Sequence, residues 1–177
     1  DGFLAALGSK LEQAAPHTLG ATDWALPKSI DHMPGPTTNE LALAVCGAHM
    51  SGMALNHELT SRGARFLETT TTSNAYSFYA LAGGPPKRPG LVRGKDGSGG
   101  EIDLEIWALP LSEVGSFLAS IPRPLGLGTV DLADGRSVQG FICEAAGTDG
   151  AENITHLKSW RTYIGTLGQT QPVAAAE

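Results

Sequence analysis

The residues best suited to chemistry gather in one short segment, AVCGAHMSGMALNHEL, at positions 44–59. It contains two histidines, His49 and His57, on either side of a glycine-containing turn. Imidazole titrates near neutral pH, so either side chain suits proton transfer. The pair lacks the further ligands of a typical zinc motif, so we expect no metal.

His49 follows a continuous apolar run, ELALAVCGA, which is typical of a strand buried on both faces. A buried strand that ends in Gly-Ala-His presents backbone N–H groups and one imidazole at a sheet edge, as many small-anion sites do. The same pattern fits a tight turn with a solvated histidine, and the residues alone leave both interpretations open. The chain contains no G-x-S-x-G, H-E-x-x-H or P-loop sequence, so those common reaction classes are unsupported.

The elements that must position this segment are short strands and helices without regular alternation. ARFLETTTT, AYSFYAL and SVQGFICEAAG have the β-branched and aromatic residues of strands, and EIDLEIW alternates like a half-buried strand. PRPLGLG is interpreted as a stiff loop, and helices are expected at 110–121 and 154–167. The pattern predicts an α+β fold whose mixed, mostly antiparallel sheet curls into a small barrel with short helices.

The ends of the chain differ from this central part. Apolar residues at three- and four-residue steps predict an amphipathic helix over 3–15, and four prolines mark 16–39 as linker. We therefore expect an N-terminal helix and linker over 1–39, a domain over 40–167 and a disordered tail over 168–177.

The composition excludes several classes of protein. The 177 residues carry 12 Lys and Arg against 18 Asp and Glu, a net charge of −6, which argues against binding nucleic acid or an anionic membrane. No apolar run approaches the ~20 residues of a membrane span, and the first residues lack the pattern of a signal peptide. We expect a cytoplasmic protein in which Cys46 and Cys143 are buried free thiols.

Five segments in order resemble the C-terminal domain of allophanate hydrolases: LAVCGAHMSGMALNHELTSRGARF, YALAGGPPKRPGLVR, EIWALP, IPRPLGLGTV and GFICEA. The resemblance covers residues 40–167, and residues 1–23 look like the stretch that joins this domain to the amidase domain. It implies a fold similar to γ-glutamyl cyclotransferases, with a ligand loop at Gly47, Ala48, His49 and Met50. It implies no cofactor.

In that family the amidase domain releases ammonia from allophanate and leaves N-carboxycarbamate, in urea or cyanuric acid breakdown. The resemblance implies that the C-terminal domain converts this small dicarboxylate to ammonia and carbon dioxide. Such a reaction needs a proton donor for nitrogen, a cation for one carboxylate and an apolar wall beside the departing one.

These requirements select candidate residues within the resemblance. His49 is the expected proton donor and His57 the second candidate. The expected substrate-binding residues are the loop residues named above together with Asn56, Tyr79, Lys87, Arg93, Leu125 and Gly126, of which Arg93 and Lys87 would hold a carboxylate and Leu125 and Gly126 would form the dry wall.

Two other functions remain open from the sequence. In the first, the domain chiefly assembles or stabilises a larger hydrolase, either by forming a homo-oligomer or by packing against its amidase domain. Alternatively it would be a γ-glutamyl cyclotransferase-like enzyme, although no Asp or Glu lies between Glu113 and Asp131, where that group places its catalytic carboxylate.

Overall fold

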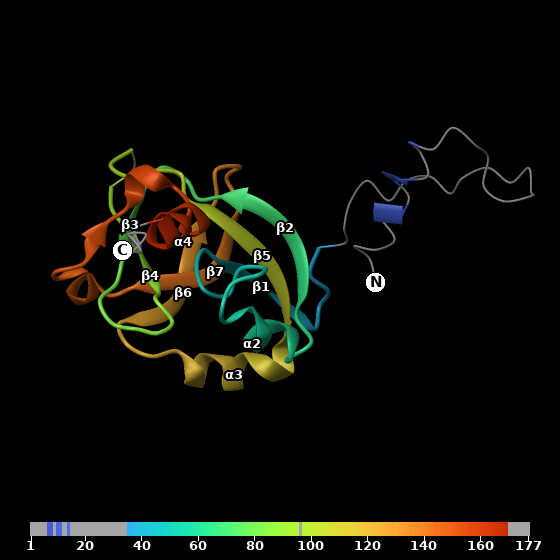
Figure 1. Cartoon of the computed structure of the whole chain (residues 1–177). Coiled ribbons are helices and arrows are strands. Elements are labelled where there is room, and N and C mark those ends of the chain that lie inside the picture. Colours follow the sequence, from blue (N-terminus) through green and yellow to red (C-terminus); the bar gives the residue numbers. More distant parts are fainter. Residues whose placement is uncertain (1–6, 9, 12–13, 15–34, 96, 170–177) are drawn as a thin grey trace, which may run out of the picture.

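The computed structural model describes residues 7, 8, 10, 11, 14, 35–95 and 97–169 (Figure 1). Its strands and helices are, in chain order, β1 (Glu40–Val45), α2 (Asn56–Thr60), β2 (Arg65–Thr71), β3 (Tyr76–Ala80), β4 (Pro89–Arg93), β5 (Asp103–Pro110), α3 (Leu111–Ser120), β6 (Leu125–Asp131), β7 (Ser137–Cys143), η1 (Ala145–Thr148), β8 (Glu152–Asn153), η2 (Thr155–Leu157) and α4 (Trp160–Gln169).

The strands form two sheets. The larger has the order β2-β5-β1-β7-β6, and the smaller has the order β4-β3-β8. Every pairing is antiparallel except that of β1 with β7. The predicted α+β class with a mixed, mostly antiparallel sheet is therefore confirmed.

The predicted barrel is wrong, because the larger sheet is curved but not closed. Within the described residues its edge strands β2 and β6 meet at a single bridge, between Thr72 and Leu132, just beyond the end of each strand. Closure requires a ladder along the whole of both edges. The chain instead leaves β2 to form β3 and β4, which pair with each other and with β8 as a separate sheet.

Two further sequence expectations need correction. Leu125 and the glycine-rich residues after it are not loop: they begin β6, and Gly128 lies opposite Gly140 of β7 in the ladder. β5 is not half-buried, since Glu105 and Trp107 on its supposed solvent face are 3% and 5% exposed. Ser51 of the loop after β1 and Arg161 of α4 bond to the Glu105 carboxylate, and Phe66 of the neighbouring strand β2 packs edge-on against Trp107. A single strand's alternation gives no sign of these contacts.

β1 lies in the middle of the larger sheet, and its second half is fully buried, as its apolar run predicts. Below the sheet in Figure 1, α3 packs against β5 and β1. The fully buried Phe117 of α3 joins the core there, and Trp160 of α4 enters the same core from another side. These contacts fix the frame around the end of β1, where the histidine segment begins.

The described positions of the expected N-terminal helix, residues 7, 8, 10, 11 and 14, are helical. The rest of that helix, the linker up to residue 34 and the tail from 170 lie outside the described residues. No helix in the described part of the chain has both the length and the apolar character needed to cross a membrane.

Candidate active site

The loop after β1 carries His49 away from the sheet in a fixed conformation. The turn closes with a hydrogen bond of 3.0 Å from the Met50 N–H to the Gly47 carbonyl. Gly47 lies so close to the Pro89 ring at the start of β4 that a Cβ atom on residue 47 would overlap it. Asn56 Nδ2 donates to the His49 carbonyl at 2.9 Å, so the first residue of α2 holds the histidine backbone.

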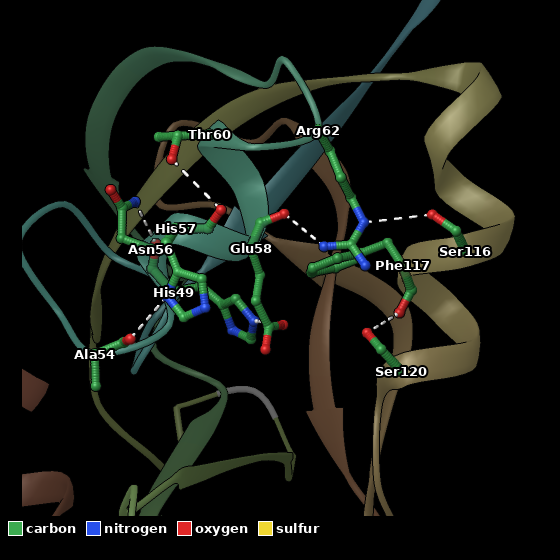
Figure 2. Close-up of polar contacts among 10 residues, drawn as sticks. All are labelled: His49, Ala54, Asn56, His57, Glu58, Thr60, Arg62, Ser116, Phe117 and Ser120. Atoms are coloured by element: carbon green, nitrogen blue, oxygen red, sulfur yellow. Dashed lines mark hydrogen bonds and ion pairs between the residues drawn. The ribbon is translucent and has the colours of Figure 1, made fainter.

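The His49 imidazole is enclosed by two aromatic rings and a carboxylate. It stacks on Phe141 with centroids 4.9 Å apart and planes 18° apart, and it meets Phe117 edge-on at 5.4 Å. Its Nε2 lies 3.1 Å from Glu58 Oε2, a contact visible in Figure 2. The His49 side chain is 13% exposed and that of Glu58 30%. The ring therefore has a defined orientation while remaining reachable.

Arg62 fixes the helix that carries Glu58. Its Nη1 donates to the Glu58 carbonyl at 2.7 Å, and its Nε donates to Ser116 Oγ on α3 at 3.3 Å (Figure 2). The guanidinium carbon lies 5.5 Å from the centre of the Phe117 ring, a cation–π distance. Arg62 thus joins α2 to α3 directly beside the His49–Glu58 pair.

Burial lowers the pKa of His49 below its ordinary value of 6.5, because the enclosing rings remove water from the charged form. The Glu58 carboxylate opposes this effect through its hydrogen bond and its charge, whereas the positive charges of Arg88 and Arg62 lower the pKa of His49 further. The imidazole is therefore mainly neutral at pH 7, and a bound anion would favour its protonation.

The cavity beside His49 is lined by both polar and apolar residues. Its volume is about 40 Å³. The polar side chains that line it belong to His49, Glu58, Arg88 and Ser120; the apolar remainder includes Val45, Leu55, Pro89, Ile121, Pro122, Leu125 and Phe141. Arg88 is half-buried, and its guanidinium makes no hydrogen bond or ion pair with any described residue.

Cys46 also lines this cavity, but burial raises the pKa of its thiol to about 12. A thiol with that pKa stays protonated and is a poor nucleophile. Cys46 and Cys143 are both buried and free, as predicted. Within the described residues, no three His, Cys, Asp or Glu side chains gather as a metal site would require.

The structure brings some of the predicted site residues together. Gly47, Ala48, His49 and Leu125 all line the cavity. Gly126 follows Leu125 in β6 but is not among the lining residues. The loop after β1 and the start of β6, which the sequence analysis assigned to one site, are thus neighbours in space.

Three other predicted residues of this region have supporting positions or point elsewhere. Asn56 holds the His49 backbone, as described above. Met50 is fully buried in the core, so its side chain stabilises the loop without lining the cavity. His57 is exposed outside the cavity, with Nδ1 3.1 Å from the Ala54 carbonyl (Figure 2).

The remaining predicted residues lie apart from His49. Arg93 pairs with Asp131 at 2.7 Å, at the opposite end of β4 from the cavity. Lys87 lines a different cavity, next to Trp160. Tyr79 is half-buried in β3 and lines neither the cavity of His49 nor that of Lys87.

Sequence reasoning missed Glu58, Arg88 and Phe141. Glu58 is nine residues from His49 in the sequence, a separation that gives no sign of contact. Arg88 precedes Pro89, which packs on Gly47. The glycine at position 47, which marks a close contact with another segment, was the one sequence feature that could have pointed to Arg88.

Comparisons with known proteins agree with this architecture. The family model described as the allophanate hydrolase C-terminal domain matches residues 41–165. Urea amidolyase of Saccharomyces cerevisiae is 38% identical over 143 residues, which is 77% of this chain and 8% of that protein. A solved Kluyveromyces lactis allophanate hydrolase is 38% identical with a TM-score of 0.71, over 82% of this chain and 24% of that one.

A further solved structure, of c4763, a uropathogenic E. coli-specific protein, is 36% identical with a TM-score of 0.66. The match covers 71% of this chain and 96% of that one. Solved chains similar to this one therefore include both a small protein and parts of much larger enzymes.

Proposed function

Because the chain belongs to the allophanate hydrolase C-terminal domain family, we propose that it decomposes N-carboxycarbamate to ammonia and carbon dioxide. This substrate is the dianion that an amidase domain leaves after removing ammonia from allophanate. It has two carboxylates on one nitrogen and no other groups. A cavity of about 40 Å³ suits so small a molecule.

The chemistry consists of two successive losses of carbon dioxide. In the first, one carbon–nitrogen bond breaks and its electron pair goes to nitrogen, which accepts a proton and leaves carbamate. In the second, carbamate loses carbon dioxide in the same way, accepts a second proton and leaves ammonia. Each step consumes one proton, so a proton donor beside nitrogen accelerates both.

His49 is the proton donor in this proposal, and Glu58 orients its ring. The free imidazole is mainly neutral, because burial lowers the pKa of His49. A bound dianion next to the ring favours the imidazolium, since opposite charges raise the pKa of a base. Substrate binding thus loads the proton that the reaction consumes, and solvent restores it afterwards.

Arg88 holds the carboxylate that stays. It lines the cavity with His49, whereas Arg93 and Lys87, the cations expected from the sequence, do not. A guanidinium binds a carboxylate through two parallel hydrogen bonds, which also fixes the substrate's orientation. The departing carboxylate faces Ile121, Pro122 and Leu125, where weak solvation favours loss of its charge as carbon dioxide.

The observation that carries this proposal is the His49–Glu58 pair in a small cavity beside Arg88, whose guanidinium has no hydrogen-bond or ion-pair partner among the described residues. The test adds this chain to a catalytically competent amidase domain and follows carbon dioxide release. The amidase domain alone gives the spontaneous background. The proposal fails if the chain adds nothing to that background rate.

Variants then identify the donor. His49→Ala should reduce the added rate by roughly 10²- to 10⁴-fold, the usual contribution of a general acid. His156 is an exposed histidine in η2, so His156→Ala is the matched control and should leave the rate unchanged. Loss of the rate in His57→Ala, with full activity in His49→Ala, would move the donor to His57.

The same proposal includes the place of this domain in a longer enzyme, since the chain spans 8% of the length of the curated relatives it matches. We place the join to an amidase domain in residues 1–39, the domain in 40–167 and a tail in 168–177, all in the cytoplasm. Expressing residues 40–167 alone tests these bounds. A cooperative unfolding transition like that of the full chain supports them, and its absence contradicts them.

An assembly role is a second proposal, carried by α3. Leu111 and Leu118 lie seven residues apart, hence on one face of the helix, and each is 50% exposed. An amidase domain or a second copy of the chain would cover them. Leu118→Lys should then release the partner on size-exclusion chromatography without changing the His49 chemistry, and an unchanged elution volume would contradict this role.

A further inference from the structure

A second cleft adjoins the cavity of His49. It is lined by Leu81, Ala82, Gly83, Gly84, Pro86, Arg88, Pro122, Arg123, Pro124 and Leu125, and its volume is about 60 Å³. Arg88, Pro122 and Leu125 line both spaces. The two are therefore neighbouring parts of one depression, with Arg88 between them.

The cleft is positively charged on an acidic protein. Arg88 and Arg123 are its charged lining residues, and no Asp or Glu lines it. Neither guanidinium makes a hydrogen bond or an ion pair with a described residue. By contrast, Arg65, Arg93, Arg136 and Arg161 each pair with a carboxylate.

We propose that this cleft is an anion-capture site, in which Arg123 binds a carboxylate of the incoming substrate and passes it to Arg88 beside His49. The proposal rests on the function proposed above and adds a route and a second binding residue to it. Gly83 and Gly84 bring no side chains into the cleft, so the arginines remain accessible to a small ligand.

Electrostatics gives the reason for such a site. The net charge of −6 repels a dianion at long range, so diffusion alone would bring the substrate to the cavity slowly. A cleft lined by one sign of charge raises the local concentration of the opposite ion and accelerates association by about 10- to 10³-fold in favourable cases. Arg123 is exposed, so it meets the ligand first; Arg88 is half-buried, so it binds the ligand where water is scarcer.

The test uses malonate, which carries two carboxylates across one bridging atom, and malonamide, a neutral molecule of similar size. Binding is measured by NMR titration of the full chain at low ionic strength. Arg123→Ala should weaken malonate binding about 3- to 10-fold, and Arg123→Glu should weaken it more, because it reverses the charge. Raising the salt to ~1 M should bring wild type and variants together, because the screening length falls to about 3 Å.

Lys95→Ala is the matched control. Lys95 is exposed and lies beyond the end of β4, six residues after Pro89 and outside the cleft. The Lys95→Ala substitution removes the same charge from the protein as Arg123→Ala. The control therefore distinguishes binding at a local site from an effect of the protein's overall charge. Malonamide binding should change in none of the variants.

Equal malonate affinity of wild type and Arg123→Glu at low salt would overturn the proposal, as would an equal loss in Lys95→Ala. The turnover assay separates this outcome from failure of the proposed function. If His49→Ala abolishes turnover while Arg123 variants bind malonate normally, the function stands and the capture site falls. If Arg123 controls malonate binding while His49→Ala turns over normally, the anion-capture site stands and the proposed function falls.

Discussion

Replacing Glu58 by Gln tests the proposed role of the His49–Glu58 pair with a minimal change in shape. The amide can still bond to the imidazole, but the negative charge 3.1 Å from Nε2 is gone. Glu58 raises the pKa of His49 both by hydrogen bonding and by charge, so its loss should lower the pKa of His49 further. Less imidazolium is then present at pH 7.

The size of the effect follows from the geometry. A carboxylate hydrogen-bonded to an imidazole favours the charged form of the ring, and the partial exposure of Glu58 weakens this effect through screening by solvent. Partly exposed ion pairs are typically worth up to about 1 kcal/mol, which is about a fivefold change in an equilibrium constant. We therefore expect the kcat/KM of Glu58→Gln to fall about fivefold at pH 7, well short of the loss in His49→Ala.

The assay records kcat/KM against pH for carbon dioxide release above the amidase background. Activity should fall as the pH rises through the pKa of free His49, and Glu58→Gln should move this fall to lower pH. NMR titration of the His49 ring checks the same shift directly. Glu113→Gln, in the first turn of α3, changes a half-buried carboxylate that contacts Ser116 and not His49, and should leave both profiles unchanged.

The reasoning is refuted if the His49 titration stays where it is, or moves to higher pH, when Glu58 becomes Gln. It is also refuted if the titration moves as expected while the pH dependence of kcat/KM does not. In that second case His49 senses Glu58, but its protonation does not control the reaction.

Three further outcomes are expected. Arg88→Ala should raise KM about 10- to 100-fold, the usual value of a hydrogen bond to a charged group, with a smaller change in kcat measured in the same assay. Arg161→Met should lower the free energy of unfolding in urea by about 2 kcal/mol, since it leaves the buried carboxylate of Glu105, 2.8 Å away, without its cation. Hydrogen bonds from Arg65 hold the pKa of Glu40 at about 2 instead of 4.5, so Glu40 contributes stability above pH 4.5 that is lost as the pH falls toward 2. Glu40→Gln should therefore lose about 1 kcal/mol at pH 7 and flatten this acid dependence, measured as urea midpoints at pH 7 and pH 3.

The sequence alone located the parts of the molecule whose signals are local. The apolar run of β1 shows a central strand, because only a strand covered on both faces lacks alternation. The Gly-Ala-His turn after it made His49 a candidate proton donor, and the glycine of that turn lies against Pro89 in the structure. Five ordered segments were enough to indicate the family.

The tertiary structure decided which side chains meet across the chain. Lys87, Arg88 and Arg93 are all cations near one strand, and the sequence favoured the first and the last. The path of β4 places Arg88 beside His49 and carries Arg93 to Asp131, because a strand that rises ~3.3 Å per residue separates its two ends by more than 10 Å. Sequence alternation describes one strand at a time, so it cannot rank these cations.

The burial of β5 and the opening of the sheet have the same origin. Glu105 looked like a solvent-facing residue, yet it accepts hydrogen bonds from Ser51, Trp107 and Arg161, which come from the loop after β1, from β5 itself and from α4. Likewise the strands predicted one by one give no indication of whether β2 and β6 pair along their length. Local patterns set each element and its apolar face, whereas contacts between distant segments depend on how all the elements pack together, and these contacts brought Glu58 and Arg88 to His49.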